Sequence, residues 1–289
     1  MDNRGYILFL MRAHPPPSDA TREWLRKVIN ADVSTIVPLA GGIAQSVTGV
    51  TTSDGREYVL RLWSRPDWRE TDPDHSPENE VAALAALAGS GLPVPEVVAV
   101  DAHGRHGEFP ALLMTRLPGT ILSSATHASP EAEPLTAGML RQLVEAAEVL
   151  HTLPVPAVGP YAPYADLTDW EPPSDHPAWD RAFAVAAARP APTPDVFIHR
   201  DYHPGNTLWQ DGRLTGIIDW TTAAHGPAGV DLAHLRINLV HAYGQWAADT
   251  VLRFAPEHNP YWDIRAVLDM VDAEDESLPA IERYLETLL

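Results

Sequence analysis

The stretch Val196–Trp220, VFIHRDYHPGNTLWQDGRLTGIIDW, decides how the rest of the chain is interpreted. Its first residues form an apolar run that predicts a short strand, after which Asp201 falls in a loop. Asn206 follows in the same loop. Asp211-Gly212 lies between two further strand-like runs and predicts a tight hairpin that leads on to Asp219. We therefore expect two carboxylates and one carboxamide at the ends of adjacent strands, facing one cleft.

These three side chains offer oxygen atoms, the ligands that Mg²⁺ prefers alongside water and phosphate oxygens. A carboxylate left free beside such an ion can orient a hydroxyl group and accept its proton. His199, Asp201 and His203 alternate along the chain, which is also compatible with a transition-metal cluster on one strand face. Pro204-Gly205 predicts a loop instead, so we favour the magnesium interpretation. We expect His199 to be structural, packing under the loop and donating to a backbone carbonyl.

The first part of the chain predicts one sheet with two helices. The strand signals are β-branched runs separated by turn residues such as Asp54-Gly55, a strong hairpin pair. The expected strands are Thr35–Leu39, Ser46–Thr52, Glu57–Leu62, Val97–Val100 and Ala111–Met114, and the expected helices are Thr21–Ile29 and Glu78–Ala88.

Leu117-Pro118-Gly119 then breaks the pattern, and we place a lobe boundary there. The second lobe begins with an expected helix over Ala137–His151, and the chain is expected to be helical again from Asp231 onward. The Pro- and Trp-rich segment 154–194 gives no assignable pattern. Strands first and helices afterwards indicate an α+β protein with lobes at 1–116 and 117–289.

The composition excludes several kinds of partner and site. A formal charge of −19 argues against nucleic acid or an anionic membrane as the main partner. The absence of cysteine excludes disulfides and thiolate metal sites. No apolar run reaches the roughly 18 residues of a membrane span, and the short patch Tyr6–Met11 does not read as a signal peptide, so we expect a cytoplasmic protein. The oligomeric state is left open.

At HRDYHPGN and IIDW the sequence resembles the aminoglycoside phosphotransferase family, which shares its fold with protein kinases. The resemblance extends over roughly residues 35–240 and includes Gly41-Gly42, the strand end at Arg61 and the helix with Glu80. It implies a two-lobed protein-kinase-like fold, with an antiparallel sheet plus helix in the N-terminal lobe and a larger, mostly helical C-terminal lobe.

Carried over residue by residue, the resemblance implies a catalytic site in the second lobe. Asp201 would be the catalytic base, or the residue that aligns the acceptor hydroxyl. Asn206 and Asp219 would hold Mg²⁺ against the phosphates of ATP or GTP. Asp231 is expected to be structural, bonding to the catalytic loop or capping the following helix.

The resemblance also implies nucleotide-binding residues in the first lobe. Arg61 would stand where the family usually has a phosphate-binding lysine, and Glu80 would pair with it. Gly41, Gly42 and the residues to Ser46 would form the loop over the phosphates, and Met114 to Arg116 would be the hinge that hydrogen-bonds the adenine.

Two departures from the family pattern matter. The chain has a single lysine, Lys27, on the first expected helix, so Arg61 must take the lysine's role or nothing does. The loop after Gly41-Gly42 is also not the G-x-G-x-x-G of protein kinases, so it does not identify a nucleotide site by itself.

The expected function is Mg²⁺-dependent phosphate transfer to a hydroxyl of a small molecule, with an antibiotic of the aminoglycoside or macrolide type as first expectation. Residues 160–289 hold 20 acidic residues, 8 Arg and no Lys, a net −12 that would attract a cationic acceptor. The run Glu274–Glu276 could belong to such an acidic wall, and Trp170 or Trp262 could stack on the acceptor or pack in the core. A metabolic kinase acting on choline, homoserine or a sugar, and a nucleotide-binding pseudoenzyme, remain alternatives.

Overall fold

The computed structural model describes residues 16–39, 45–65, 68–71, 75–122, 133–188, 190–271 and 277–289. Gly41, Gly42, the patch Tyr6–Met11 and the acidic run Glu274–Glu276 lie outside the described residues. The chain divides into two compact units, one of Met1–Ala88 with Val94–Leu117 and one of Gly89–Pro93 with Pro118–Leu289. No helix among the described residues is long and apolar enough to span a membrane.

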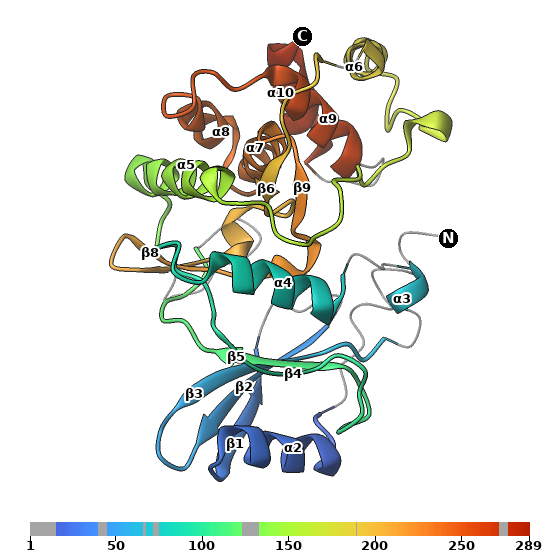
Figure 1. Ribbon diagram of the computed structural model, residues 1–289. Coiled ribbons are helices and arrows are strands. Elements are labelled where there is room, and N and C mark those ends of the chain that lie inside the picture. The colour runs from blue at the N-terminus through green and yellow to red at the C-terminus, as the bar shows by residue number, and fades with distance from the viewer. Residues whose placement is uncertain are drawn as a thin grey trace. The chain divides into compact units, whose positions relative to one another are not determined.

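The first unit is built on a five-stranded antiparallel sheet with the order β1-β2-β3-β5-β4 (Figure 1). Its strands are β1 (Val33–Pro38), β2 (Ser46–Thr52), β3 (Glu57–Leu62), β4 (Val97–Asp101) and β5 (Ala111–Thr115). Its helices are α2 (Asp19–Ile29), α3 (Trp68–Thr71) and α4 (Pro77–Leu87). The expected strands and helices are all present, and the Asp54-Gly55 turn joins β2 to β3.

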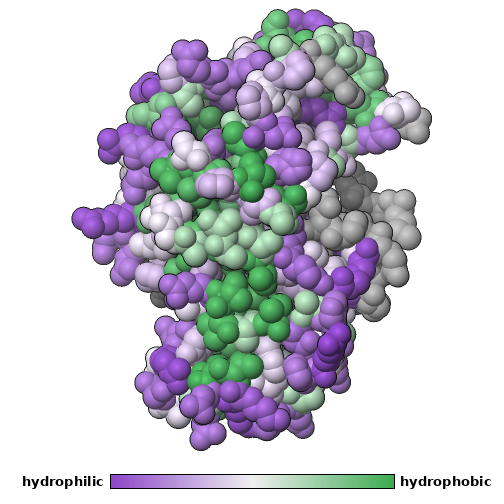
Figure 2. Space-filling model, viewed as in Figure 1, coloured by the Kyte–Doolittle hydropathy of each residue, from purple (hydrophilic) through white to green (hydrophobic). Residues whose placement is uncertain are grey.

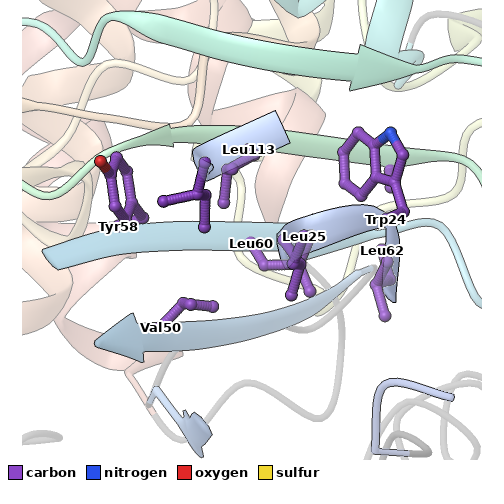
Figure 3. Packing of buried hydrophobic residues seen from close by; sticks show 9 residues of the cluster. Trp24, Leu25, Val50, Tyr58, Leu60, Leu62 and Leu113 are labelled. Carbon is purple, nitrogen blue, oxygen red and sulfur yellow. The ribbon is translucent and has the colours of Figure 1, made fainter. Parts of the chain in front are cut away.

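Alternation along the strands gives this sheet two buried faces. One face packs against α2, with Trp24 and Leu25 against Leu60 and Leu113 (Figure 3). The other face packs Leu112 and Met114 with Trp63 and with Val81 of α4. Since successive side chains of a strand point to opposite faces, neighbours in β5 serve different cores.

The second unit is mostly helical, as the sequence predicted. Its helices are α5 (Ala137–Thr152), α6 (Ala178–Ala188), α7 (Gly229–Tyr243), α8 (Gln245–Val251), α9 (Pro260–Met270) and α10 (Leu278–Leu288). The expected apolar face of α5 is buried at Leu140, Leu143, Val144 and Ala147. Helix α6 falls in the segment that the sequence left unassigned. Within this unit α7 packs against both α8 and α9 (Figure 1).

Two small antiparallel ribbons carry the remaining strands of the second unit. The first pairs β6 (Val196–Ile198) with β9 (Ala224–Gly226), and the second pairs β7 (Thr207–Gln210) with β8 (Arg213–Ile217). Asp211 and Gly212 both have positive φ, at 53° and 72°, as a tight hairpin turn requires. The short 3₁₀ turns η1 (Leu167–Asp169), η2 (Pro204–Asn206) and η3 (Trp220–Thr222) complete the unit.

The backbone just after the division at residue 117 requires a glycine. Gly119 has φ +104°, and a Cβ there would lie 2.5 Å from Thr215 Oγ1 and 2.7 Å from the carbonyl oxygen of Trp209. Thr120 and Trp209 exchange two backbone hydrogen bonds at this point. The division falls one residue later than expected, and 89–93 joins the second unit, where Pro93 accepts a bond from the amide of Ile217.

The visible surface is partly hydrophilic and partly apolar (Figure 2). Hydrophilic residues dominate the outline of the face shown in Figure 2, with apolar areas between them. Among the exposed apolar side chains are Val98 and Val100 of β4 and Trp246 of α8.

Candidate functional site

Asp201 lies in the loop between β6 and η2, and this loop is held by a buried carboxylate from α7. Asp231 accepts hydrogen bonds from the backbone amides of His199 (3.1 Å) and Arg200 (2.8 Å). Arg200 adopts the left-handed conformation with φ +70°, which is unusual for a residue other than glycine. The two hydrogen bonds that the Asp231 carboxylate accepts stabilise this turn directly before Asp201.

Asp231 itself is fully buried and is supported by His151 of α5, whose Nε2 lies 2.9 Å from Asp231 Oδ2. Burial opposes its ionisation, but the hydrogen bond from His151 and the nearby backbone donor keep the pKa of Asp231 below its ordinary value. The expected structural role of Asp231 therefore takes the form of a loop anchor.

Both carboxylate oxygens of Asp201 are engaged. Asn206 Nδ2 donates to Oδ2 at 2.8 Å and to the backbone carbonyl of Asp201 at 3.0 Å. On the other oxygen, Oδ1, His234 Nε2 lies at 2.9 Å and His203 Nε2 at 3.6 Å. Burial works against the charged form, yet the bonds from His203 and His234 outweigh it and hold the pKa of Asp201 well below its usual range. Asp201 is thus a carboxylate at neutral pH, fixed in orientation from two sides.

Asp219 is joined to Asn206 through its neighbour Ile218. The amide of Ile218 donates to the backbone carbonyl of Asn206 at 2.9 Å, and the Ile218 carbonyl lies 3.0 Å from Nε2 of His199. Asp219 has φ 64° and ψ 63°, and its Oδ1 accepts a 2.7 Å bond from the hydroxyl of Thr221. A left-handed aspartate is sparsely populated and marks a position where surrounding structure fixes an unusual backbone.

His199 has the structural position that the sequence predicted. Its ring is fully buried, packs at 4.4 Å from the ring of Trp220 and lies within hydrogen-bonding distance of the carbonyl of Ile218. Burial lowers its pKa, so the neutral ring bridges the loop to the strand end. It ties the segment of Asp201 to the segment of Asp219.

The donor set fits a magnesium ion in its chemistry. The amide nitrogen of Asn206 is turned to Asp201, which leaves its carbonyl oxygen Oδ1 as the atom to offer to a cation. Asp219 adds carboxylate oxygens, and hard oxygen donors suit Mg²⁺. Within the described ranges, no group of three or more His, Asp or Glu side chains is arranged to hold a metal ion.

In the first unit, Arg61 and Glu80 form the expected pair. Arg61 Nη1 donates to Glu80 Oε1 at 2.7 Å, and both side chains are buried. Arg61 Nη2 donates to Gln45 Oε1 at 2.7 Å, so the guanidinium also fixes the residue just before β2. The planar group bridges strand, helix and loop, which a lysine ammonium on a single stem could not do with the same geometry.

The other expected nucleotide residues lie in this unit as well. Ser46 begins β2 opposite Leu62 and is buried. Met114 is a core residue of β5, and the following amides of Thr115 and Arg116 donate to the carbonyls of Glu96 (2.9 Å) and Glu57 (3.4 Å). These two amides already have partners within the sheet.

Sequence reasoning did not find His234, which lies on α7 one turn beyond Asp231. No motif marks it, because its contact with Asp201 joins positions far apart in the chain. Tyr164 was also missed: its ring lies 4.7 Å from the guanidinium carbon of Arg200 and 6.1 Å from the ring of His234. For His234, the only available signal would have been its spacing of three residues from Asp231, which places both residues on one helix face.

A five-stranded sheet packed by helices, followed by a helical unit with a supported aspartate loop, defines the kinase-like class of phosphotransferases. The chain belongs to the phosphotransferase enzyme family, which it matches over residues 35–266. This confirms the resemblance inferred from the sequence and extends it beyond residue 240.

Solved structures share the fold at low sequence identity. Macrolide 2'-phosphotransferase MphH from Brachybacterium faecium has a TM-score of 0.60 at 20% identity, over 87% of this chain and 88% of that one. A thermostable mutant of aminoglycoside phosphotransferase APH(4)-Ia, in a ternary complex with ADP and hygromycin B, has a TM-score of 0.64 at 17% identity, over 92% of this chain and 97% of that one. Amicoumacin kinase hAmiN, in complex with AMP-PNP and Ca²⁺, has a TM-score of 0.59 at 13% identity, over 92% of each chain.

Proposed function

We propose that this protein transfers the γ-phosphate of ATP or GTP to a hydroxyl group of a small molecule, with an antibiotic of the aminoglycoside or macrolide type as acceptor. The observation that carries the proposal is the ionised Asp201, fixed by Asn206 on one oxygen and by His234 on the other. Such a carboxylate can align a hydroxyl group without reorganising when the substrate arrives. We place the reaction in the cytoplasm, where these nucleotides are available.

Asp201 is the group that acts on the acceptor. The acceptor hydroxyl gives its proton to the carboxylate while its oxygen bonds to the γ-phosphorus and the bond to the β-phosphate oxygen breaks, releasing ADP or GDP. In this reaction class, positioning and charge stabilisation supply most of the catalysis. The bonds from His234 and Asn206 hold Asp201 in one orientation during this exchange.

Asn206 and Asp219 are the residues that would hold Mg²⁺. When bound, the ion neutralises charge on the nucleotide phosphates. Support for a nucleotide with a divalent ion comes from the fold relatives, since amicoumacin kinase hAmiN was solved with AMP-PNP and Ca²⁺. The loop bond from Ile218 to Asn206 keeps the two candidate ligands in fixed relation.

The residues that we assign to nucleotide binding lie in the first unit. By the family resemblance, Arg61 would take the place of the phosphate-binding lysine, and its ion pair with Glu80 orients it. Gly41, Gly42 and Ser46 would cover the phosphates, and the segment Met114 to Arg116 would contact the base. Bonds from Arg61 to Glu80 and Gln45 keep it in one conformation, so we expect its contribution to be positional as well as electrostatic.

The test is phosphate transfer from labelled ATP or GTP, with Mg²⁺ and a panel of antibiotics and metabolites, for the wild type beside Asp201→Asn. We expect a labelled product with the wild type and a loss of about a hundredfold or more in Asp201→Asn. A product made only from choline, homoserine or a sugar would favour the metabolic kinase. If neither protein transfers phosphate although both still bind nucleotide, a pseudoenzyme would be favoured.

A further inference from the structure

The second unit contains a cavity of about 910 Å³ bounded by the loop that carries η1, by α6 and the segment after it, and by α9. Helices α6 and α9 pack against one another and lie near each other in Figure 1. Pockets of this size hold drug-sized molecules. None of the roles assigned above uses it.

Aromatic residues and prolines make up nine of the nineteen described residues that line this cavity. The rings belong to Tyr161, Tyr164, Phe183, Tyr261 and Trp262. Trp262 meets Tyr161 edge-on at 6.4 Å and Tyr261 at 5.0 Å, so these rings fix one another's orientation. Phe183 stacks on Trp170 at 6.0 Å while remaining 38% exposed. Preset, partly exposed rings favour a large apolar surface as the ligand.

The charged residues in the described lining already have partners. Asp166 accepts bonds from the amide and hydroxyl of Thr168. Asp195 lies 3.0 Å from Nδ1 of His225. Arg265 donates to Asp269 at 2.6 Å. The described lining thus sets two carboxylates against one guanidinium, a smaller excess of negative charge than a polycationic ligand would require.

The cavity reaches the catalytic loop through Tyr164. A narrow space beside it is lined by Tyr161, Tyr164, Arg200 and His234, and the two cavities share both tyrosines. His234 lies 2.9 Å from Asp201. A molecule seated against Tyr164 would lie beside the His234 ring, and its hydroxyl must extend past this ring to meet the Asp201 carboxylate.

We propose that this cavity binds the acceptor, and that the acceptor has a large apolar skeleton with a free hydroxyl and at most one positive charge, not a polycation. The proposal rests on the function proposed above for its link to Asp201. It narrows the two antibiotic types to the one whose skeleton is mainly hydrocarbon, such as a macrolactone.

The experiment titrates the full chain, with AMP-PNP and Mg²⁺ present, with erythromycin and with kanamycin by calorimetry. We expect erythromycin to bind with a dissociation constant that changes less than about twofold between 0.05 and 0.5 M salt, since an apolar contact is hardly screened. Phe183→Ala should weaken binding by about tenfold, because the ring loses its contact with the ligand. Trp246→Ala, which removes an exposed ring from α8, is the matched control and should change nothing.

Three results overturn the proposal: kanamycin binding that weakens steeply with salt while erythromycin does not bind, equal erythromycin affinity in Phe183→Ala and wild type, or no binding of either probe. The outcomes for the two proposals are separable. Phosphate transfer to kanamycin, unaffected by Phe183→Ala, would leave the phosphotransferase intact and remove the apolar acceptor. Erythromycin binding that depends on Phe183, with no phosphate transfer to any acceptor, would keep the apolar binding site and remove the phosphotransferase function.

Discussion

Removal of the Asp231 carboxylate is expected to destabilise the second unit and to abolish phosphate transfer, because the loop that carries Asp201 loses its anchor. In Asp231→Ala the amides of His199 and Arg200 lose their acceptor inside the protein. Each unsatisfied buried donor costs about 1–3 kcal/mol, and release of the buried charge offsets part of the total, so we expect a loss of about 3 kcal/mol. The bond to His151 goes at the same time.

The assay is urea unfolding followed by tryptophan fluorescence, since Trp220 is buried next to His199. Asp180→Ala, which removes an exposed aspartate from α6, is the control and should change the free energy of unfolding by less than about 0.5 kcal/mol. A loss below about 1 kcal/mol in Asp231→Ala, with normal phosphate transfer, would refute the view that this residue holds the loop.

The pH dependence gives an independent check on the same residue. The folded-state pKa of Asp231 lies below the ordinary value of 3.8. Its ionised form therefore stabilises the wild type above that value, and the gain is lost as the pH falls through the lower, folded-state pKa. The difference in stability between wild type and Asp231→Ala should accordingly be full at neutral pH and shrink in acid. A difference that grows in acid would contradict the assignment.

Three further changes test other parts of the structure. Arg61→Ala should weaken nucleotide binding at least about tenfold, whereas Arg61→Lys keeps the charge and should lose less; unchanged binding in the alanine variant would remove Arg61 from the site. His234→Leu should lower kcat by about tenfold with little change in the KM for nucleotide, and His234→Gln should recover part of it; a change confined to KM would argue against positioning of Asp201. Gly119→Ala should cost about 2 kcal/mol or more in denaturant unfolding because of its φ of +104°. Gly138→Ala, in an open helical position, should cost nothing, and equal costs at both glycines would refute the steric argument.

Local patterns carried most of the fold prediction. The pairs Asp54-Gly55 and Asp211-Gly212 fixed two hairpins, and the apolar spacing on α5 gave its buried face. Helix α6 was not predicted because prolines and tryptophans around it obscure its period. The strand β9 is only three residues long and exists through its pairing with β6, which no local signal contains.

The residues of the candidate site likewise fall into those that a local motif predicts and those that it does not. Asp201, Asn206 and Asp219 share one continuous motif, so their proximity could be predicted, and the buried pair of Arg61 and Glu80 followed from the family resemblance. His234 could not be predicted, since it reaches Asp201 from a helix 33 positions later. The distribution of charge around the cavity could not be predicted either, because the net charge of a sequence does not show where its charged side chains lie in the fold.

The most direct test of the central claim is whether Asp219 confers magnesium dependence on nucleotide binding. The measurement is the dissociation constant of a fluorescent ATP analogue with and without Mg²⁺, for the wild type, Asp219→Asn and the control Asp211→Asn, whose turn also suits asparagine. We predict that Mg²⁺ tightens binding to the wild type and to Asp211→Asn by about tenfold or more, and that Asp219→Asn loses most of this gain. The same magnesium-dependent gain in all three proteins would contradict the account.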